Sequence, residues 1–160
     1  MILLLCAAFP AVCKAAGAGK GIFRVSLGVT EATVQTTTVS GNQASTSDNG
    51  TVTGFGVSAE YLYPVSRRFY VGPSILHWSL PSADGIPSSS GTPIGAALAY
   101  QVGSDSDIRA VVGSTVQIGY DQNFGHDWTR PGAFATLAFV IPHDVQQVSG
   151  FAYLGIGYHF

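Results

Sequence analysis

The stretch Ala152-Tyr153-Leu154-Gly155-Ile156-Gly157-Tyr158-His159-Phe160 carries an apolar or aromatic residue at every second position. Successive side chains of a β-strand point to opposite sides, so residues 152, 154, 156, 158 and 160 share one face. The other face carries small or partly polar residues. In a soluble domain the last residues usually fray. A patterned stripe that runs through Phe160 therefore predicts a strand whose apolar face lies against lipid.

Length and composition agree with membrane-spanning strands. The 160 residues suffice for one domain, and a spanning strand needs roughly 9–11 residues. Charged residues make up 10% of the chain, whereas soluble domains contain about 25%. After the N-terminal segment, no run approaches the ~20 apolar residues of a spanning helix. The net charge of −2 and the scattered basic residues give no reason to expect a nucleic-acid partner.

The first residues differ from the rest. Residues 2–9 are apolar, and Pro10 and several small residues follow, as in the core and cleavage region of a secretory signal peptide. The positively charged start of such a peptide is missing. We expect residues 1–17 to be a signal peptide and residues 18–160 to form one β-barrel domain. Both cysteines, Cys6 and Cys13, lie in the expected signal peptide.

Strand-like runs are separated by turn-forming clusters. Seven runs are visible, at 21–40, 51–63, 69–78, 93–101, 108–120, 133–141 and 145–160. The connections alternate between long and short, which is typical of outer-membrane barrels with long outer loops and short periplasmic turns. This rhythm places the connections 41–50, 81–91 and 121–131 outside, and 64–68, 103–107 and 142–144 on the periplasmic side.

Seven runs conflict with the even strand number of bacterial barrels. One run must then hide two strands. The first candidate is 21–40, because its apolar phase changes from odd positions (Phe23 to Val29) to even positions (Ala32, Val34). A β-bulge would explain the same change. The run 145–160 is the second candidate. We predict eight strands.

The chain resembles the small, eight-stranded bacterial outer-membrane β-barrel family, most specifically in its final strand. The resemblance implies an all-β fold, an antiparallel up-and-down transmembrane barrel, located in the bacterial outer membrane as a monomer. It implies contact with outer-membrane lipid and lipopolysaccharide, and recognition of Tyr158 and Phe160 by the barrel-assembly machinery. Members of this kind serve structural or surface-interaction roles through their outer loops, and no cofactor is expected.

If the apolar stripes face lipid, the alternate positions face the lumen. This phase places an interior polar network at Arg24, Glu60, Arg109 and Gln117, with Glu60 predicted to pair with Arg24 or Arg109. A charge that faced lipid would cost about 2–4 kcal/mol near the bilayer midplane. Such a network can form a gate or simply satisfy buried charge, and we favour the second interpretation because side chains fill an eight-stranded barrel.

Aromatic residues cluster near the ends of the expected strands, as in interfacial girdles. The two predicted levels are Tyr61, Tyr63, Phe69, Tyr70 and Tyr100 at one end, and Trp78, Tyr120 and Trp128 at the other.

Three alternative functions remain open. His77 and Ser79 form an H-x-S pattern similar to that of outer-membrane lipid A 3-O-deacylases, although the acidic residue expected about a dozen positions later is missing. A narrow channel or a carrier of apolar solutes is the second alternative, and a soluble secreted barrel is the third. A metal site at Asp121, His126 and Asp127 lacks a further ligand at a recognisable spacing, so no metal is expected.

Overall fold

The computed structural model describes residues 21–40, 43–82, 88–124, 130–142 and 148–160. The predicted signal peptide, 1–17, lies outside these residues. Within them, no helix is long and apolar enough to cross a membrane.

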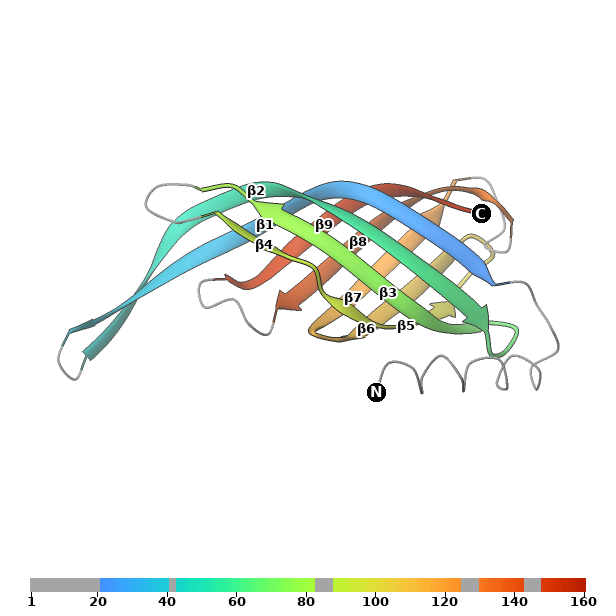
Figure 1. Ribbon diagram of the computed structural model, residues 1–160, viewed down its shortest axis with the longest axis horizontal. Coiled ribbons are helices and arrows are strands. Elements are labelled where there is room, and N and C mark those ends of the chain that lie inside the picture. Colours follow the sequence, from blue (N-terminus) through green and yellow to red (C-terminus); the bar gives the residue numbers. More distant parts are fainter. Residues whose placement is uncertain (1–20, 41–42, 83–87, 125–129, 143–147) are drawn as a thin grey trace.

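The described chain is all-β and forms one antiparallel sheet that closes on itself (Figure 1). Its strands are β1 (Ile22–Ser40), β2 (Gln43–Pro64), β3 (Phe69–Leu80), β4 (Ser89–Gly91), β5 (Ile94–Gln101), β6 (Ser106–Gly113), β7 (Thr115–Asn123), β8 (Gly132–Pro142) and β9 (Val148–His159). Strands that are neighbours in sequence pair with each other, except that β4 and β5 both pair with β3, and β1 also pairs with β9.

The barrel wall contains eight strands. Both β4 and β5 pair with the same edge of β3, at Trp78–Leu80 and at Phe69–Ile75 respectively. They are therefore two parts of one strand that is interrupted at residues 92–93. The predicted fold, an antiparallel up-and-down barrel of eight strands, is confirmed.

The strand that the sequence analysis did not resolve lies in the run 108–120. This run contains β6 and β7, which form a tight hairpin with Val112 opposite Val116. Three residues separate this pair, so even-numbered residues point outward in both β6 and β7. The alternation thus continues through the turn without a change of phase. Both predicted positions of the extra strand, 21–40 and 145–160, are wrong.

The two ends of the barrel follow from the register. At the end that we call the terminal end, His159 lies opposite both Arg24 and Gly132. At the opposite end, the hairpin end, Thr115 lies opposite Pro142. The connection between β7 and β8 therefore belongs to the terminal end, and the connection after β8 belongs to the hairpin end. The sequence analysis predicted 121–131 outside and 142–144 on the periplasmic side, and both assignments are wrong. The unrecognised hairpin adds one more connection, so every later connection changes to the opposite end of the barrel.

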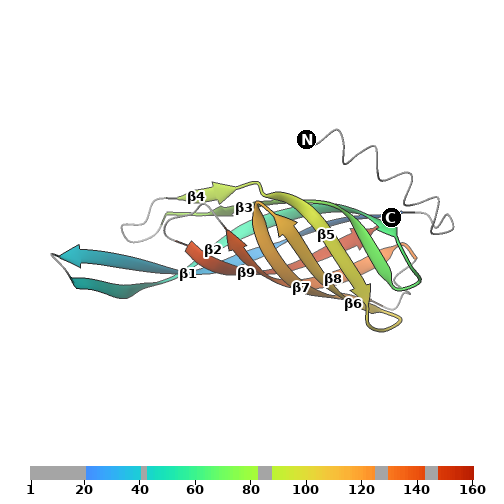
Figure 2. The same cartoon turned by 90° about the horizontal axis from the view of Figure 1, so that it is seen from below.

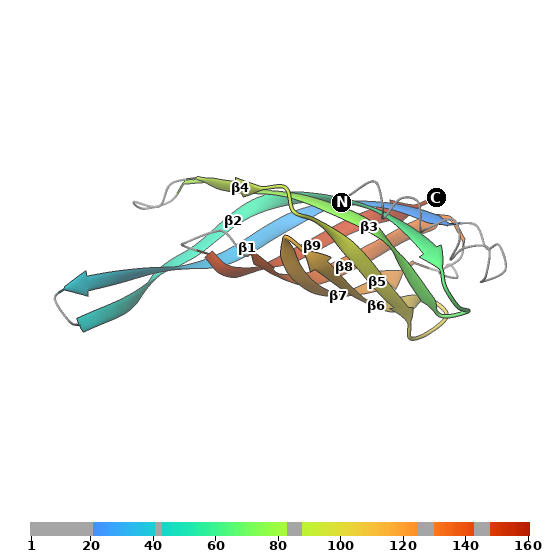
Figure 3. The same cartoon turned by 60° about the horizontal axis from the view of Figure 1, so that its bottom comes forward.

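A long hairpin extends from the barrel wall (Figures 2 and 3). Strands β1 and β2 remain paired from Gln35 opposite Asp48 to Ser40 opposite Gln43. These pairs lie beyond the last pairing of β1 with β9, at Val34, and of β2 with β3, at Phe55. The predicted loop 41–50 is therefore strand from Gln43 onward.

The change of phase within β1 coincides with bulges rather than with a turn. The register shifts between Ala32 and Val34 against β9, and between Thr33 and Gln35 against β2. On the β2 side Gly50 has a φ of 101°, in the left-handed region that glycine tolerates. The run therefore contains a β-bulge, but the bulge begins after Ala32, which keeps the inward, even phase of Arg24 and Thr30.

Side chains that point into the barrel fill it with two apolar clusters and a polar layer. The cluster near the hairpin end contains Ala32, Val52, Leu76, Trp78, Leu80, Ala138, Val140, Phe151 and Tyr153. The second contains Ile22, Leu62, Tyr70, Ala97, Ala99 and Val111. Glycine provides room for the largest rings, because a Cβ at Gly157 would overlap the ring of Phe134. Ala32 faces the first cluster, which explains an apolar residue at an inward position.

Candidate functional site

The outer surface of the barrel is an apolar band to which every strand of the wall contributes. Leu27, Val57, Ile118, Leu137 and Ile156 are between 48% and 64% exposed. Others on the same surface include Val29, Phe55, Ile75, Ile94, Leu98, Ile108, Val112, Phe139, Ile141 and Leu154. Soluble monomers rarely expose a contiguous apolar patch above a few hundred Å². A closed band of this kind suits a hydrocarbon surrounding, as in a transmembrane barrel.

Aromatic side chains gather on the outside of the terminal end. Phe23 lies 6.0 Å from Phe160, and Tyr158 lies 4.9 Å from Phe160, between ring centroids. Tyr100 and Tyr120 are exposed near the same end, since both align with Ile108. The prediction that placed Tyr120 at the opposite level was wrong, because β7 runs toward the terminal end.

Two residues of the predicted girdles lie inside the barrel. Tyr70 and Trp78 are 4% and 1% exposed. Trp78 packs against Phe151, with ring centroids 5.2 Å apart. Both have even numbers on β3, whose even positions point inward. Trp128 lies outside the described residues.

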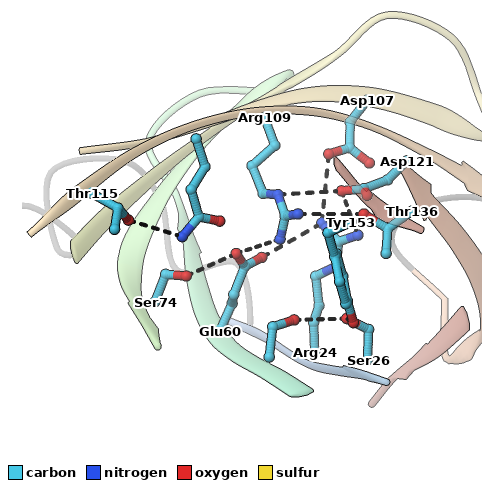
Figure 4. Close-up of polar contacts among 12 residues, drawn as sticks. Arg24, Ser26, Glu60, Ser74, Asp107, Arg109, Thr115, Asp121, Thr136 and Tyr153 are labelled. Atoms are coloured by element: carbon cyan, nitrogen blue, oxygen red, sulfur yellow. Dashed lines mark hydrogen bonds and ion pairs between the residues drawn. The ribbon is translucent and has the colours of Figure 1, made fainter. Parts of the chain in front are cut away.

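The centre of the barrel holds five charged side chains from four strands (Figure 4). Arg24 of β1 donates to Asp121 of β7 at 2.7 Å and to Asp107 of β6 at 3.5 Å. Arg109 of β6 donates to Glu60 of β2 and lies 3.7 Å from Asp121. We call these five residues the ionic network. All are at most 4% exposed, so they are shielded from solvent on every side.

Neutral side chains extend the ionic network toward the wall. Ser74 donates to Glu60 at 3.0 Å, and Arg109 donates to Thr136 at 3.3 Å. The guanidinium carbon of Arg24 lies 4.3 Å from the ring centroid of Phe134, at cation–π distance. These contacts tie β1, β2, β3, β6, β7 and β8 together across the lumen.

A second group of hydroxyls lies near the network. Ser26 forms hydrogen bonds to Ser58 at 2.7 Å and to the Tyr153 hydroxyl at 2.8 Å. The ring of Tyr153 lies over Gly56, whose added Cβ would meet it at 2.9 Å. Burial of the tyrosine is possible because its hydroxyl has partners and its ring rests on glycine.

The structure places all four residues of the predicted interior network inside the barrel. Glu60 contacts Arg109 directly and lies 4.0 Å from Arg24. Gln117 is 5% exposed but hydrogen-bonds to Thr115 at 3.3 Å, apart from the ionic network.

Two central members of the network were not predicted. Asp107 and Asp121 were assigned to a turn and to a loop, yet both have 0% exposure. Each continues the odd, inward phase of its strand, together with Arg109 and Gln117. That phase was the available signal, and the turn-like composition around these residues concealed it.

His77 and Ser79 lie on the outer surface of β3, where His77 is exposed. The Nδ1 atom of His77 hydrogen-bonds to the Thr92 hydroxyl at 2.9 Å. Among the described residues, no hydrogen bond joins His77 to Ser79 and no carboxylate orients the imidazole. A serine nucleophile needs a base and the base needs an orienting group, so this geometry does not favour the hydrolase alternative.

The residues considered for a metal are separated. Asp121 points into the ionic network, whereas His126 and Asp127 lie outside the described residues. In the described ranges, no group of three or more histidine, cysteine or acidic residues is arranged to hold a metal ion.

Tyr158 and Phe160 share the outer face of the final strand. The backbone N–H of Phe160 donates to the carbonyl of Phe23 at 2.8 Å, which fastens this residue to β1. Their use as an assembly signal stays a prediction.

Loss of one guanidinium tests the role of the ionic network. We expect Arg109→Met to lower the free energy of unfolding by about 3–5 kcal/mol, because Glu60 and Asp121 would lose a buried partner. Urea unfolding in lipid vesicles, followed by gel mobility with and without heating, measures this change. Arg68→Met, in an exposed turn, should change stability by less than about 0.5 kcal/mol. Equal effects of the two substitutions would contradict a stabilising network.

No protein-family model and no curated protein sequence matches the chain. Among solved structures, the chain is similar to Ail, the attachment invasion locus protein of Yersinia pestis. The TM-score is 0.45 at 14% sequence identity for Ail itself. It is 0.46 at 13% identity for Ail in complex with the heparin analogue sucrose octasulfate. Each comparison covers 89% of this chain and 100% of the Ail chain.

Proposed function

We propose that this protein is a small bacterial outer-membrane barrel with a structural or surface-interaction role, exerted at its hairpin end. The observation that carries the proposal is the closed apolar band around a charged, filled interior. A barrel with an apolar outer surface and a charged interior needs lipid around it. On this basis the hairpin end faces the exterior and the terminal end faces the periplasm.

The hairpin of β1 and β2 is the part best placed to meet a partner. Its outer pairs, from Gln35–Asp48 to Ser40–Gln43, contact no third strand in the described register. Both edges therefore carry backbone groups that are free to pair with an added strand. An extended polypeptide segment is the class of partner that such edges accept.

The two ends of the barrel differ in their charged residues. Outside residues 1–20 and the ionic network, the basic residues are Arg67, Arg68 and Arg130, and all belong to the terminal end. The described parts of the hairpin end, 31–40, 43–53, 79–82, 88–93 and 148–150, contain no lysine or arginine, but contain Asp48 and the exposed Glu31. The complex of Ail contains a heparin analogue. For this chain we propose a neutral or basic polypeptide, because an acidic surface repels polyanions.

Filling of the lumen argues against the channel alternative. Trp78, Phe151 and Tyr153 pack near the hairpin end, and the ionic network occupies the centre. Eight-stranded barrels are generally filled in this way. The proposal includes cleavage of residues 1–17, contact with lipopolysaccharide, recognition of Tyr158 and Phe160 during assembly, and a monomeric state.

Cysteine labelling on intact cells tests location and orientation together. We expect Ser45→Cys, in the hairpin, to react with a membrane-impermeant maleimide. Ser104→Cys, in the turn between β5 and β6, should react only after the outer membrane is permeabilised. The chain without an added cysteine is the control, because Cys6 and Cys13 belong to the proposed signal peptide. Labelling of residue 104 but not of residue 45 on intact cells would show that the barrel has the opposite orientation.

Removal of the hairpin tests the interaction. We expect replacement of residues 36–47 by Asn-Gly to leave the unfolding midpoint unchanged, since the removed part of β1 and β2 pairs only with itself. The shortened protein in lipid nanodiscs should lose binding to an extended peptide of alternating lysine and threonine, and neither form should bind heparin. Equal peptide binding by both forms would show that the hairpin is not the interaction site.

A further inference from the structure

The ionic network contains one more carboxylate than guanidinium. Glu60, Asp107 and Asp121 face Arg24 and Arg109, and none of the five is more than 4% exposed. If every group were ionised, the centre of the barrel would carry one uncompensated negative charge. Such a charge is costly in a medium of low polarity, and proteins avoid it by binding a proton or a counter-ion.

The excess is concentrated at one pair of neighbouring residues. Asp107 of β6 lies directly opposite Asp121 of β7 in the strand register. Like charges directly opposite each other destabilise a sheet. Arg24 approaches both carboxylates at their Oδ2 atoms, at 3.5 Å and 2.7 Å.

The remaining oxygens of this pair are buried without a partner. Oδ1 of Asp107 and Oδ1 of Asp121 have no hydrogen bond to any described residue, and both side chains are fully buried. Buried polar atoms in folded proteins almost always have a partner. Two unpartnered carboxylate oxygens on adjacent strands indicate a positively charged ligand.

We propose that the Asp107–Asp121 pair takes up one positive charge from solvent, a proton or a small monovalent cation, when the barrel folds. The bound charge neutralises the ionic network and supplies the missing partner of the Oδ1 atoms. This site is independent of the proposed surface interaction, because it lies inside the barrel, on the inward faces of β6 and β7, rather than at the hairpin end.

Asp107 is the residue with the excess charge. Asp121 lies 2.7 Å from Arg24 and 3.7 Å from Arg109. Glu60 is held by Arg109 and by Ser74. Among the described residues, Asp107 has one ion-pair partner, Arg24 at 3.5 Å. Neutralisation of Asp107 therefore removes the excess and disturbs the fewest contacts.

The charged and titratable groups that face the pair come from four strands. Arg24 belongs to β1, Glu60 to β2, Arg109 to β6, and Tyr153 and His159 to β9. His159 lies opposite Arg24 and stacks on Phe134 at 5.8 Å. Its imidazolium is the competing source of positive charge, and the experiment must separate it from the Asp107–Asp121 pair.

The experiment measures urea unfolding of the full barrel in lipid vesicles across mildly acidic to mildly alkaline pH. Each pH is studied with sodium chloride and with N-methylglucamine chloride at equal ionic strength. A proton held in the folded state and released on unfolding makes the unfolding midpoint fall as pH rises. A bound sodium ion makes the midpoint higher in sodium chloride than in N-methylglucamine chloride. The two salts thus distinguish a proton from a cation.

Three variants complete the test. Asp107→Asn should lose the pH or sodium dependence and keep a midpoint near that of the natural chain. Asp121→Asn should lower the midpoint clearly, because Arg24 and Arg109 lose a close partner. His159→Gln should keep the dependence. The proposal is overturned if the natural chain shows neither dependence, if Asp107→Asn retains it, if His159→Gln abolishes it, or if the two asparagine variants are equally destabilised.

Discussion

Apolar side chains around the whole circumference of the barrel are the constraint on which the other features depend. Every strand of the wall contributes exposed apolar side chains to the outer surface, as at Leu27, Ile118 and Leu154. Successive side chains of a strand point to opposite faces. When the outward positions are apolar, the polar residues of the strand occupy the inward positions. Most charges of the wall therefore point inward, because a charge that faces lipid is destabilising by about 2–4 kcal/mol near the midplane; the exposed Glu31 lies toward the hairpin end of β1. The ionic network is thus a consequence of the outer surface, and its ion pairs join the strands across the lumen.

Sequence pattern predicted the class of fold and most of the interior, because both depend on a period of two. Arg24, Glu60, Arg109 and Gln117 could be placed inside from phase alone. The hairpin of β6 and β7 could not be found in this way, since three residues separate Val112 from Val116 and the phase continues across the turn. That single omission reversed the sides assigned to 121–131 and 142–144. It also placed Tyr120 at the wrong level.

Other differences between prediction and structure arose where a segment has the composition of a loop or turn but is paired within the barrel. The segment from Gln43 to Gly50 has the composition of a loop, but in the barrel it is the partner of β1. Asp107 and Asp121 have the composition of turns, but their partners are guanidinium groups far away in sequence. Long-range ion pairs of this kind leave no local pattern. Trp78 was expected at the interface on the basis of residue type, although its even position on β3 already pointed inward.

In the proposed function, the outer surface anchors the barrel in the membrane and the projecting hairpin contacts a partner. The central claim, that the apolar band touches lipid, is tested by one tryptophan placed within it. In a Trp78→Phe, Trp128→Phe background, Ile118→Trp positions an indole at an outward site of β7 that is 62% exposed. We expect its fluorescence in vesicles to be blue-shifted and strongly quenched by lipids with brominated acyl chains. Red-shifted emission without quenching, from protein that stays dissolved without detergent, would contradict the account.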